Sequence, residues 1–311
     1  MNSELKVGFI GFGEAGFHIA RGLRGAGVSG ISAYDINTHT PGLGEKIQRR
    51  ARESEVALVE SNAELARASD LLLSTVTANR AREAAEQTAP FLEARHLYAD
   101  LNSVSPALKQ SIGEIVESRD ARFVEAAIMS PVPPHGHRVP LFLGGASAQS
   151  FVELLAPFGM KLEIISDQIG AASATKMCRS IIVKGLEALL LECVLGAVPY
   201  GADERVFATL EETMPGVNWR KLASYMVGRV VEHGERRARE MEEVAATLRA
   251  IGVEPIMAEA TVKRQDWLAK LDLLSEFGGR APEDYHAIVR AIAEKERRIN
   301  NHAHEHPNHL D

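Results

Sequence analysis

The chain is poor in cysteine and in aromatic residues, and both shortages narrow the classes of protein to which it can belong. Its two cysteines, Cys178 and Cys193, fall within one predicted helix, where a rise of about 1.5 Å per residue separates them by about 20 Å. That separation is far beyond disulfide reach, so we expect free thiols and a reducing, cytoplasmic location. Aromatic residues make up only 5% of the 311 residues, which favours helices and buried parallel strands over an antiparallel sandwich.

Long hydrophobic runs are also missing. No segment approaches the roughly 20 apolar residues that span a bilayer, and the N-terminus lacks a signal-peptide pattern, so we expect no membrane partner. The net charge of -7 argues against a nucleic-acid partner, which would need a basic face. The motifs of zinc proteases, zinc ribbons, P-loop enzymes and nucleophile-elbow hydrolases do not occur. The histidine-rich end at 302–309 has no supporting framework, so no metal is expected.

Short apolar runs alternate with amphipathic stretches in the first half of the chain. The expected strands are 6–11, 30–35, 71–76, 96–100, 122–127, 141–144 and 162–165, with helices such as 15–26 and 78–88 between them. Near-continuous apolar strands separated by helices are typical of a doubly wound parallel sheet with helices on both faces. The predicted fold class is therefore α/β, with a Rossmann domain over residues 1–168.

The second half predicts helices only. They are expected at 170–195, 202–213, 219–251, 255–274 and 282–298. Residues 169–311 should therefore form an all-α C-terminal domain, built on the long interdomain helix that opens it.

A G-x-G-x-x-G motif lies between the first predicted strand and the first predicted helix. Its residues, all expected to bind a cofactor, are Gly11, Phe12, Gly13, Glu14, Ala15 and Gly16. One glycine makes the tight turn, one lets the backbone approach a pyrophosphate, and one lets helix and strand pack closely. The diphosphate would rest on the free N–H groups and positive dipole of the helix start. Thr75, Val76 and Thr77, at the end of another predicted strand, are expected to contact the same cofactor.

Asp35 ends the second predicted strand, where a dinucleotide-binding domain places its ribose-binding carboxylate. A carboxylate there accepts hydrogen bonds from the adenosine ribose and repels a 2′-phosphate. The next four residues, 36–39, contain no arginine that could pair with such a phosphate. The pattern therefore favours NAD, with NADP as the alternative.

Lys176 lies in the segment Gly170 to Lys176 that opens the long helix. The positive end of a helix dipole disfavours a charged lysine, and partial burial in an interdomain cleft would lower the pKa of Lys176 further. Such a lysine could accept a proton from a hydroxyl as hydride leaves, or return one during reduction. Lys184, two turns further along the same face, is expected to lie in solvent.

These motifs, in this order, resemble the β-hydroxyacid dehydrogenase superfamily, which includes 3-hydroxyisobutyrate and 6-phosphogluconate dehydrogenases. The resemblance runs from GFIGFGEAGFHIARGL through Asp100–Pro106 and Arg122–Gly145 to the G-x-x-x-x-x-K that ends at Lys176. It implies that Lys176 is the catalytic acid/base and that Ser103 lies near substrate and nicotinamide. It also implies a small, acidic substrate and a homodimer formed through the helical domain.

The sequence departs from the family pattern around the substrate. Ala172 replaces a glycine of the lysine motif, Ser180 an asparagine, and Val183 the glutamate of the decarboxylating phosphogluconate enzymes. The usual glycine-rich substrate loop has become a proline-rich turn over 129–138, with Ser130 as a hydrogen-bond donor and Arg138 or a histidine as an anion contact.

Three functions follow from this pattern. The first is a dehydrogenase acting on a small β-hydroxy acid, with Ser103, Ser130, Arg179 and Ser180 orienting the substrate. The second is a dinucleotide-binding sensor without chemistry, and the third is a ketone or imine reductase. The fold alone does not separate them, because function belongs to the site.

Overall fold

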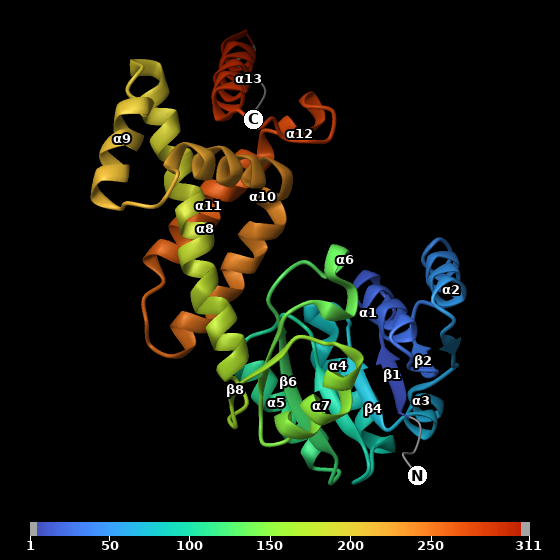
Figure 1. Cartoon of the computed structure of the whole chain (residues 1–311). Helices are drawn as coiled ribbons and strands as arrows, with labels where there is room; N and C mark the ends of the chain where they lie inside the picture. The colour runs from blue at the N-terminus through green and yellow to red at the C-terminus, as the bar shows by residue number, and fades with distance from the viewer. Residues whose placement is uncertain (1–4, 306–311) are drawn as a thin grey trace, which may run out of the picture. The chain divides into compact units, whose positions relative to one another are not determined.

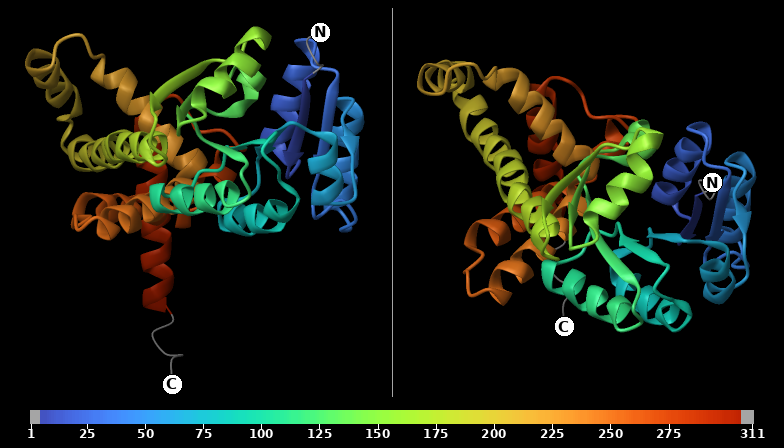
Figure 2. Two further views of the ribbon diagram at one scale, coloured as in Figure 1. Left: turned by 90° about the horizontal axis from the view of Figure 1, so that it is seen from below. Right: turned by 60° about the horizontal axis from the view of Figure 1, so that its bottom comes forward.

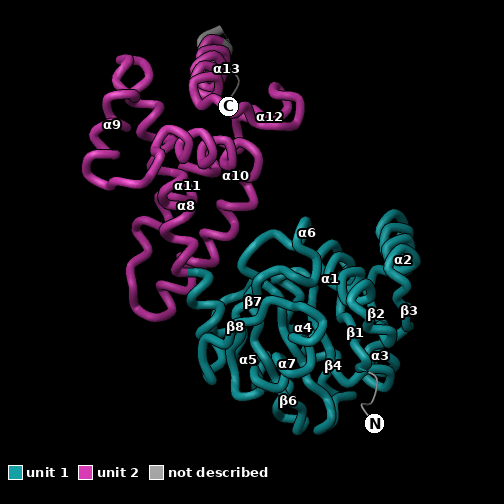
Figure 3. The backbone as a smooth tube through the Cα atoms, in the orientation of Figure 1, with its two compact units in different colours: residues 1–177 teal, residues 178–311 magenta. Residues whose placement is uncertain are grey.

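The structure is a computed structural model that describes residues 5–305, with only the backbone for 300 and for 302–305. It divides into two compact units, Met1–Met177 and Cys178–Asp311 (Figure 3). The boundary falls inside the long helix α8 (Ala171–Ala197), whereas the sequence placed it near residue 168, before that helix. The first turns of α8 therefore belong to the sheet unit.

An eight-stranded sheet forms the centre of the first unit, with the order β3-β2-β1-β4-β5-β6-β7-β8. The strands are β1 (Lys6–Ile10), β2 (Gly30–Tyr34), β3 (Ala57–Leu58), β4 (Leu71–Ser74), β5 (Leu97–Asp100), β6 (Arg122–Ile128), β7 (Leu141–Gly144) and β8 (Leu162–Ser166). The six strands β1 to β6 are parallel, as expected of a Rossmann sheet. Two details differ from the prediction: β3 was not foreseen, and β7 runs antiparallel to β6.

Helices cover both faces of this sheet (Figures 1 and 2). One apolar core packs the sheet against α1 (Glu14–Gly25), α2 (Leu43–Glu53) and α7 (Ala148–Leu155). The other packs it against α3 (Asn62–Ala68), α4 (Ala81–Thr88) and α5 (Pro106–Glu117). Leu71 and Leu73 belong to the first core and Leu72 to the second, because successive side chains of a strand point to opposite faces.

Shorter helical turns complete the first unit and the end of α8. They are α6 (Val132–His135), η1 (Ala78–Arg80), η2 (Ala89–Phe91), η3 (Gly136–Arg138), η4 (Ala156–Phe158) and η5 (Val198–Tyr200).

Strand β1 lies between β2 and β4 in the sheet. The chain therefore builds the sheet outward from β1 in one direction through β2 and β3, and in the opposite direction from β4 onward. This is the point at which the strand order reverses, and ligands of open α/β sheets bind in the crevice there.

The described part of the second unit is all helical, as predicted. Beyond α8 it contains α9 (Asp203–Thr213), α10 (Trp219–Ala250), α11 (Ile256–Lys270), α12 (Leu273–Glu276) and α13 (Tyr285–Glu305). The helix expected over 255–274 is interrupted because Asp272 adopts a left-handed conformation with φ of +47°. None of the described helices is long and apolar enough to cross a membrane.

A buried polar cluster holds α8, α10 and α11 together. Glu187 accepts a 2.6 Å hydrogen bond from Arg237 Nε, and Gln265 Nε2 donates to the same carboxylate at 3.2 Å. Burial raises the pKa of Glu187, although Arg237 opposes that shift. Lys184 is 6% exposed and lies 2.9 Å from Glu240 Oε2. The expectation that Lys184 lies in solvent was therefore wrong, because α10 packs over that face of α8.

Candidate functional site

The three glycines of the first turn occupy three different environments. Gly11 has φ of +80°, and a Cβ there would lie 2.7 Å from Cγ1 of Val76. A Cβ on Gly16 would lie 2.8 Å from Thr75 Oγ1, so α1 packs closely against the end of β4. A Cβ on Gly13 would meet nothing within 4 Å. Gly11 thus adopts the positive φ that the turn requires, and Gly16 allows the close contact between α1 and the end of β4. At Gly13 no protein atom would block the approach of a ligand to the backbone.

Hydrogen bonds tie this turn to the ends of β2 and β4. Asp35 Oδ2 accepts from the Phe12 N–H at 2.7 Å, and Asp35 Oδ1 accepts from the Asn37 N–H at 2.9 Å. Thr75 Oγ1 donates to the Gly11 carbonyl at 2.7 Å. The Asp35 carboxylate is therefore held in a fixed position at the carboxyl end of β2.

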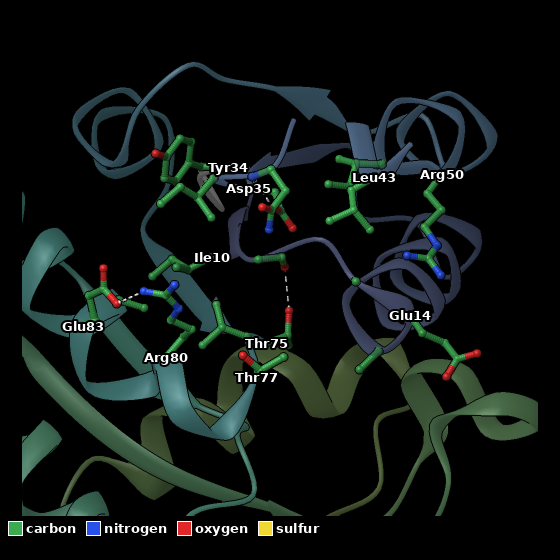
Figure 4. A pocket seen from close by; sticks show the side chains of 18 of the residues that line it. Ile10, Glu14, Tyr34, Asp35, Leu43, Arg50, Thr75, Thr77, Arg80 and Glu83 are labelled. Carbon is green, nitrogen blue, oxygen red and sulfur yellow. Dashed lines mark hydrogen bonds and ion pairs between the residues drawn. The ribbon is translucent and has the colours of Figure 1, made fainter. Parts of the chain in front are cut away.

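A pocket of about 590 Å³ opens at this edge of the sheet. The predicted cofactor residues that line it are Gly11, Gly13, Glu14, Ala15, Asp35, Thr75, Val76 and Thr77. Figure 4 shows Asp35 between two groups of side chains, with Tyr34, Arg80 and Glu83 on one side and Leu43 and Arg50 on the other. A volume of this size is usual for small-molecule and cofactor sites.

Two residues of the motif do not line the pocket. The Phe12 side chain is fully buried and packs edge-on against Phe9, with ring centroids 6.1 Å apart, so only the backbone of Phe12 serves the turn. Gly16 lies beneath Thr75, inside the packing between α1 and β4. The strand-to-helix turn directs the Phe12 side chain into the core, so the prediction that Phe12 belongs to the cofactor site rests on its backbone alone.

Several pocket residues were not singled out from the sequence. Lys46 and Arg50 reach the pocket from α2, Asn62 from the start of α3, and Arg80 from the end of η1. Lys46 and Arg50 lie on the amphipathic helix α2, where their sequence pattern is the same as that of an ordinary solvated face. Asn62 follows the helix-capping Ser61, and nothing in that pattern distinguishes it from a residue of a helix start.

This arrangement fits a dinucleotide. The open position at Gly13 and the N-terminus of the 12-residue helix α1 would hold a diphosphate, whose charge the helix dipole stabilises. Asp35 would hold the ribose hydroxyls beside it. Apolar side chains from Ile10, Tyr34 and Val76 provide walls on which a flat base can lie.

Comparison with known proteins supports the same assignment. Residues 6–154 match the family described as the NAD binding domain of 6-phosphogluconate dehydrogenase, and residues 197–268 match a domain of unknown function, DUF1932. A conserved hypothetical protein from Sinorhizobium meliloti 1021, whose structure is known, is 34% identical in sequence to this chain. The two structures superpose with a TM-score of 0.82, and the match covers 94% of this chain and 97% of that one.

The conserved protein MTH1747, reported as structurally similar to 3-hydroxyacid dehydrogenases, is 31% identical with a TM-score of 0.74. The match covers 86% of this chain and 99% of that one. The mitochondrial 3-hydroxyisobutyrate dehydrogenase of Drosophila melanogaster is 25% identical over 68% of this chain and 64% of its own length. The chain is a divergent member of the β-hydroxyacid dehydrogenase superfamily. Residues 6–154 therefore form an NAD-binding domain of the kind found in oxidoreductases of this superfamily.

The family's lysine position lies at the start of α8, and β6 holds that helix start in place. The buried carboxylate of Glu125 accepts hydrogen bonds from the N–H groups of Gly170 and Ser173, each at 2.6 Å. Lys176 is half-buried and follows Ser173 by one turn. Glu125 thus satisfies two N–H groups that a helix start leaves unpaired, and it places a negative charge at the positive end of the α8 dipole.

The predicted substrate residues divide between the two units. Ser103 is exposed after β5 and Ser130 is half-buried after β6, so both lie at the carboxyl edge of the same sheet. Arg179 is exposed and Ser180 half-buried, and both belong to the second unit. Ser180 Oγ accepts a 3.0 Å hydrogen bond from Lys184, so this hydroxyl contributes to the helical cluster.

A buried ion pair that was not predicted from the sequence lies at the carboxyl ends of β4 and β5. Lys109 on α5 is fully buried, and its Nζ lies 2.6 Å from both the carbonyl oxygen and Oδ1 of Asp100. Asp100 in turn accepts from the backbone N–H and Nδ2 of Asn102, and Asn102 Nδ2 donates to Ser74 Oγ at 2.9 Å. The cluster therefore fixes the loop that begins with Asn102 and Ser103.

Among the predicted histidine candidates, His137 has a structural role, and the histidine-rich end lies outside the described side chains. His137 is buried, its Nε2 lies 3.1 Å from the Phe158 carbonyl oxygen, and burial lowers its pKa. A Cβ on Gly22 of α1 would strike the His137 ring, so this histidine packs within the fold and is no anion contact, whereas Arg138 is exposed. The side chains of 302–309 lie outside the described residues, and no potential metal cluster occurs among the residues that are described.

Proposed function

We propose that the chain is an NAD-dependent dehydrogenase that transfers a hydride between the nicotinamide cofactor and a small β-hydroxy acid or its carbonyl form. The pocket lined by Gly11, Gly13 and Asp35 at the reversal point of the sheet carries this proposal. Membership of the superfamily supports it, because relatives such as the Drosophila enzyme are 3-hydroxyisobutyrate dehydrogenases.

Lys176 is the acid/base of the proposed reaction. As a neutral amine it takes the hydroxyl proton of the substrate during oxidation, and as an ammonium it returns that proton during reduction. Ser103 and Ser130 orient the substrate oxygens by hydrogen bonds, and Arg179 and Ser180 complete the set taken over from the resemblance. A carboxylate on the substrate would suit the cationic Arg179.

Turnover of a Lys176→Ala variant tests this assignment. The nicotinamide absorbance is followed with NAD and NADP in both directions, over a panel of β-hydroxy acids, their semialdehydes and cyclic imines. We expect turnover to fall at least about 100-fold in the variant while NADH still binds. Unchanged turnover would remove Lys176 from the mechanism. NADH binding without turnover of any compound would favour a sensor, and activity on imines alone a reductase.

For the cofactor, we propose a preference for NAD. The fixed carboxylate of Asp35 supports it, since it would repel a 2′-phosphate. Lys46 and Arg50 line the same pocket and would attract such a phosphate, so the comparison is a direct test. We expect NADH to bind at least about tenfold more tightly than NADPH, and Asp35→Asn to narrow that difference. Tighter binding of NADPH, lost in Lys46→Met and Arg50→Met, would reverse the assignment.

A homodimer through the helical unit is a further proposal, taken from the superfamily. Exposed apolar side chains on α8, Ile182 at 71% and Leu189 at 56%, lie seven residues apart and so on one face of that helix. Light scattering of the wild type and of an Ile182→Lys/Leu189→Lys variant tests it. We expect a dimer that the double substitution converts to monomer.

A further inference from the structure

Asn62 is the buried polar residue of the pocket that the arrangement so far leaves without a role. It is the first residue of α3 and only 8% exposed, yet it lines the pocket. Its Oδ1 is buried and has no hydrogen-bond partner among the described residues. An unsatisfied buried acceptor is costly, so a native structure that keeps one calls for an explanation.

The fold places this amide beside the apolar half of the pocket. Strand β3 ends at Leu58, and α3 begins four residues later at the same, carboxyl edge of the sheet. Helix α3 contacts both β2 and α4, and Ala84 of α4 also lines the pocket. Tyr34 and Ile10 line the same half, and Figure 4 shows both on the Arg80 side of Asp35.

We propose that the side-chain amide of Asn62 recognises the adenine base of the dinucleotide by accepting a hydrogen bond from its exocyclic amine. The inference rests on the proposed function only as far as dinucleotide binding, and it does not depend on Lys176 or on any substrate. It adds a base-reading residue to a pocket whose motif residues are proposed to hold the ribose and the phosphates.

Amide chemistry fits this ligand. A carboxamide carries one acceptor and one donor side by side, and adenine presents an amine donor next to a ring-nitrogen acceptor. Rotation about the Cβ–Cγ bond can turn the amide edge that carries both atoms toward the pocket, where Oδ1 would accept from the amine and Nδ2 would donate to the ring nitrogen. Oδ1, which has no partner among the described residues, would thereby gain a donor.

Binding of two dinucleotides that differ by a single group tests the proposal. The first is NADH, and the second is its analogue with unsubstituted purine in place of adenine, which has the same shape but no amine. Both are titrated by calorimetry into the wild type and into Asn62→Leu, which removes both amide groups at similar volume. Gln149→Leu makes the same chemical change at an exposed position on α7, away from the pocket.

We expect the wild type and Gln149→Leu to bind NADH about tenfold more tightly than the purine analogue. In Asn62→Leu the two affinities should become equal, mainly through weaker NADH binding. Asn62→Ser has too short a side chain to reach the base and suits a helix start, so it replaces the leucine variant if that variant does not fold.

Two results would overturn the inference. Equal affinities in the wild type would show that the amine is not recognised, and an undiminished preference in both Asn62 variants would assign its recognition to another residue. In either case NADH still binds, and the proposed function is unaffected. Absence of NADH binding by the wild type would instead refute the proposed function, and the inference with it.

Discussion

Lys109 Nζ lies 2.6 Å from Asp100 Oδ1, and both side chains are essentially inaccessible to solvent. A buried pair of this kind adds little net stability over an apolar pair, but removal of one partner leaves the other charge buried without compensation. We expect Lys109→Met to lower the free energy of unfolding by about 3–5 kcal/mol, measured by urea denaturation. Lys161→Met, at an exposed position, should change it by less than about 0.5 kcal/mol. A similar small change for Lys109→Met would mean that Asp100 is compensated by other groups.

Gly11 and Gly13 should respond differently to the same added methyl group. In Gly11→Ala the new Cβ meets Val76 and the backbone keeps a positive φ, so we expect a loss of about 2–3 kcal/mol of stability. In Gly13→Ala the methyl group meets no protein atom, so stability should change by less than about 1 kcal/mol. NADH affinity should nevertheless fall at least about tenfold in Gly13→Ala, because the methyl group lies where the diphosphate approaches. Thermal melts and titrations with NADH separate the two effects, and undiminished NADH affinity in Gly13→Ala would place the diphosphate elsewhere.

Glu125 should influence turnover through the position of α8. Glu125→Gln keeps the shape of the side chain but loses the charge that the N–H groups of Gly170 and Ser173 contact. If Lys176 is the acid/base, a displaced helix start should lower kcat about 10–100-fold while the Kd for NADH stays within about twofold. Glu125→Asp retains the charge and should recover part of kcat. Glu163→Gln on β8, where the side chain is exposed, is the control. Equal loss in the Asp and Gln variants would point to packing in place of the hydrogen bonds.

His137 should make stability depend on pH. Burial lowers its pKa below the ordinary value of 6.5, so the folded protein keeps the neutral ring while the unfolded chain takes up a proton. The contribution of His137 to stability is therefore complete above pH 6.5 and is lost as pH falls from 6.5 through the folded pKa, by at most about 1.4 kcal/mol per pH unit. Denaturation at pH 8 and pH 5 should show a smaller acid loss for His137→Gln than for the wild type. The exposed His135→Gln should behave as the wild type does, and an unchanged acid loss in His137→Gln would contradict the mechanism.

The sheet was largely predictable because its buried strands are short apolar runs with turn residues at both ends. Leu71–Ser74 and Leu97–Asp100 are fully buried, so burial and strand pattern coincide. The two residues of β3 are too few to give such a pattern. The direction of β7 could have been inferred. A parallel return usually runs through a crossover helix, and the segment 129–140 contains only short turns.

The glycine-rich turn was predictable because its requirements are local. A positive φ at Gly11 and a carboxylate at the end of β2 follow from residues within one strand–helix–strand unit. The second half of the candidate site was not. Glu125 contacts the start of α8 across 45 residues of sequence. The Lys184–Glu240 ion pair, which lies in the helical cluster and not in the site, likewise depends on how α10 packs against α8.

By itself, then, the sequence determined the two-part architecture, the turn at Gly11 to Gly16 and the position of Asp35, because backbone conformation and apolar periodicity are properties of neighbouring residues. Only the tertiary structure decided which charges are buried and what they contact. It placed Lys109 on Asp100, Glu125 on the α8 N-terminus and Asn62 in the pocket wall. Those outcomes depend on desolvation, and desolvation is set by which elements pack together rather than by the residues that lie beside a side chain in the chain.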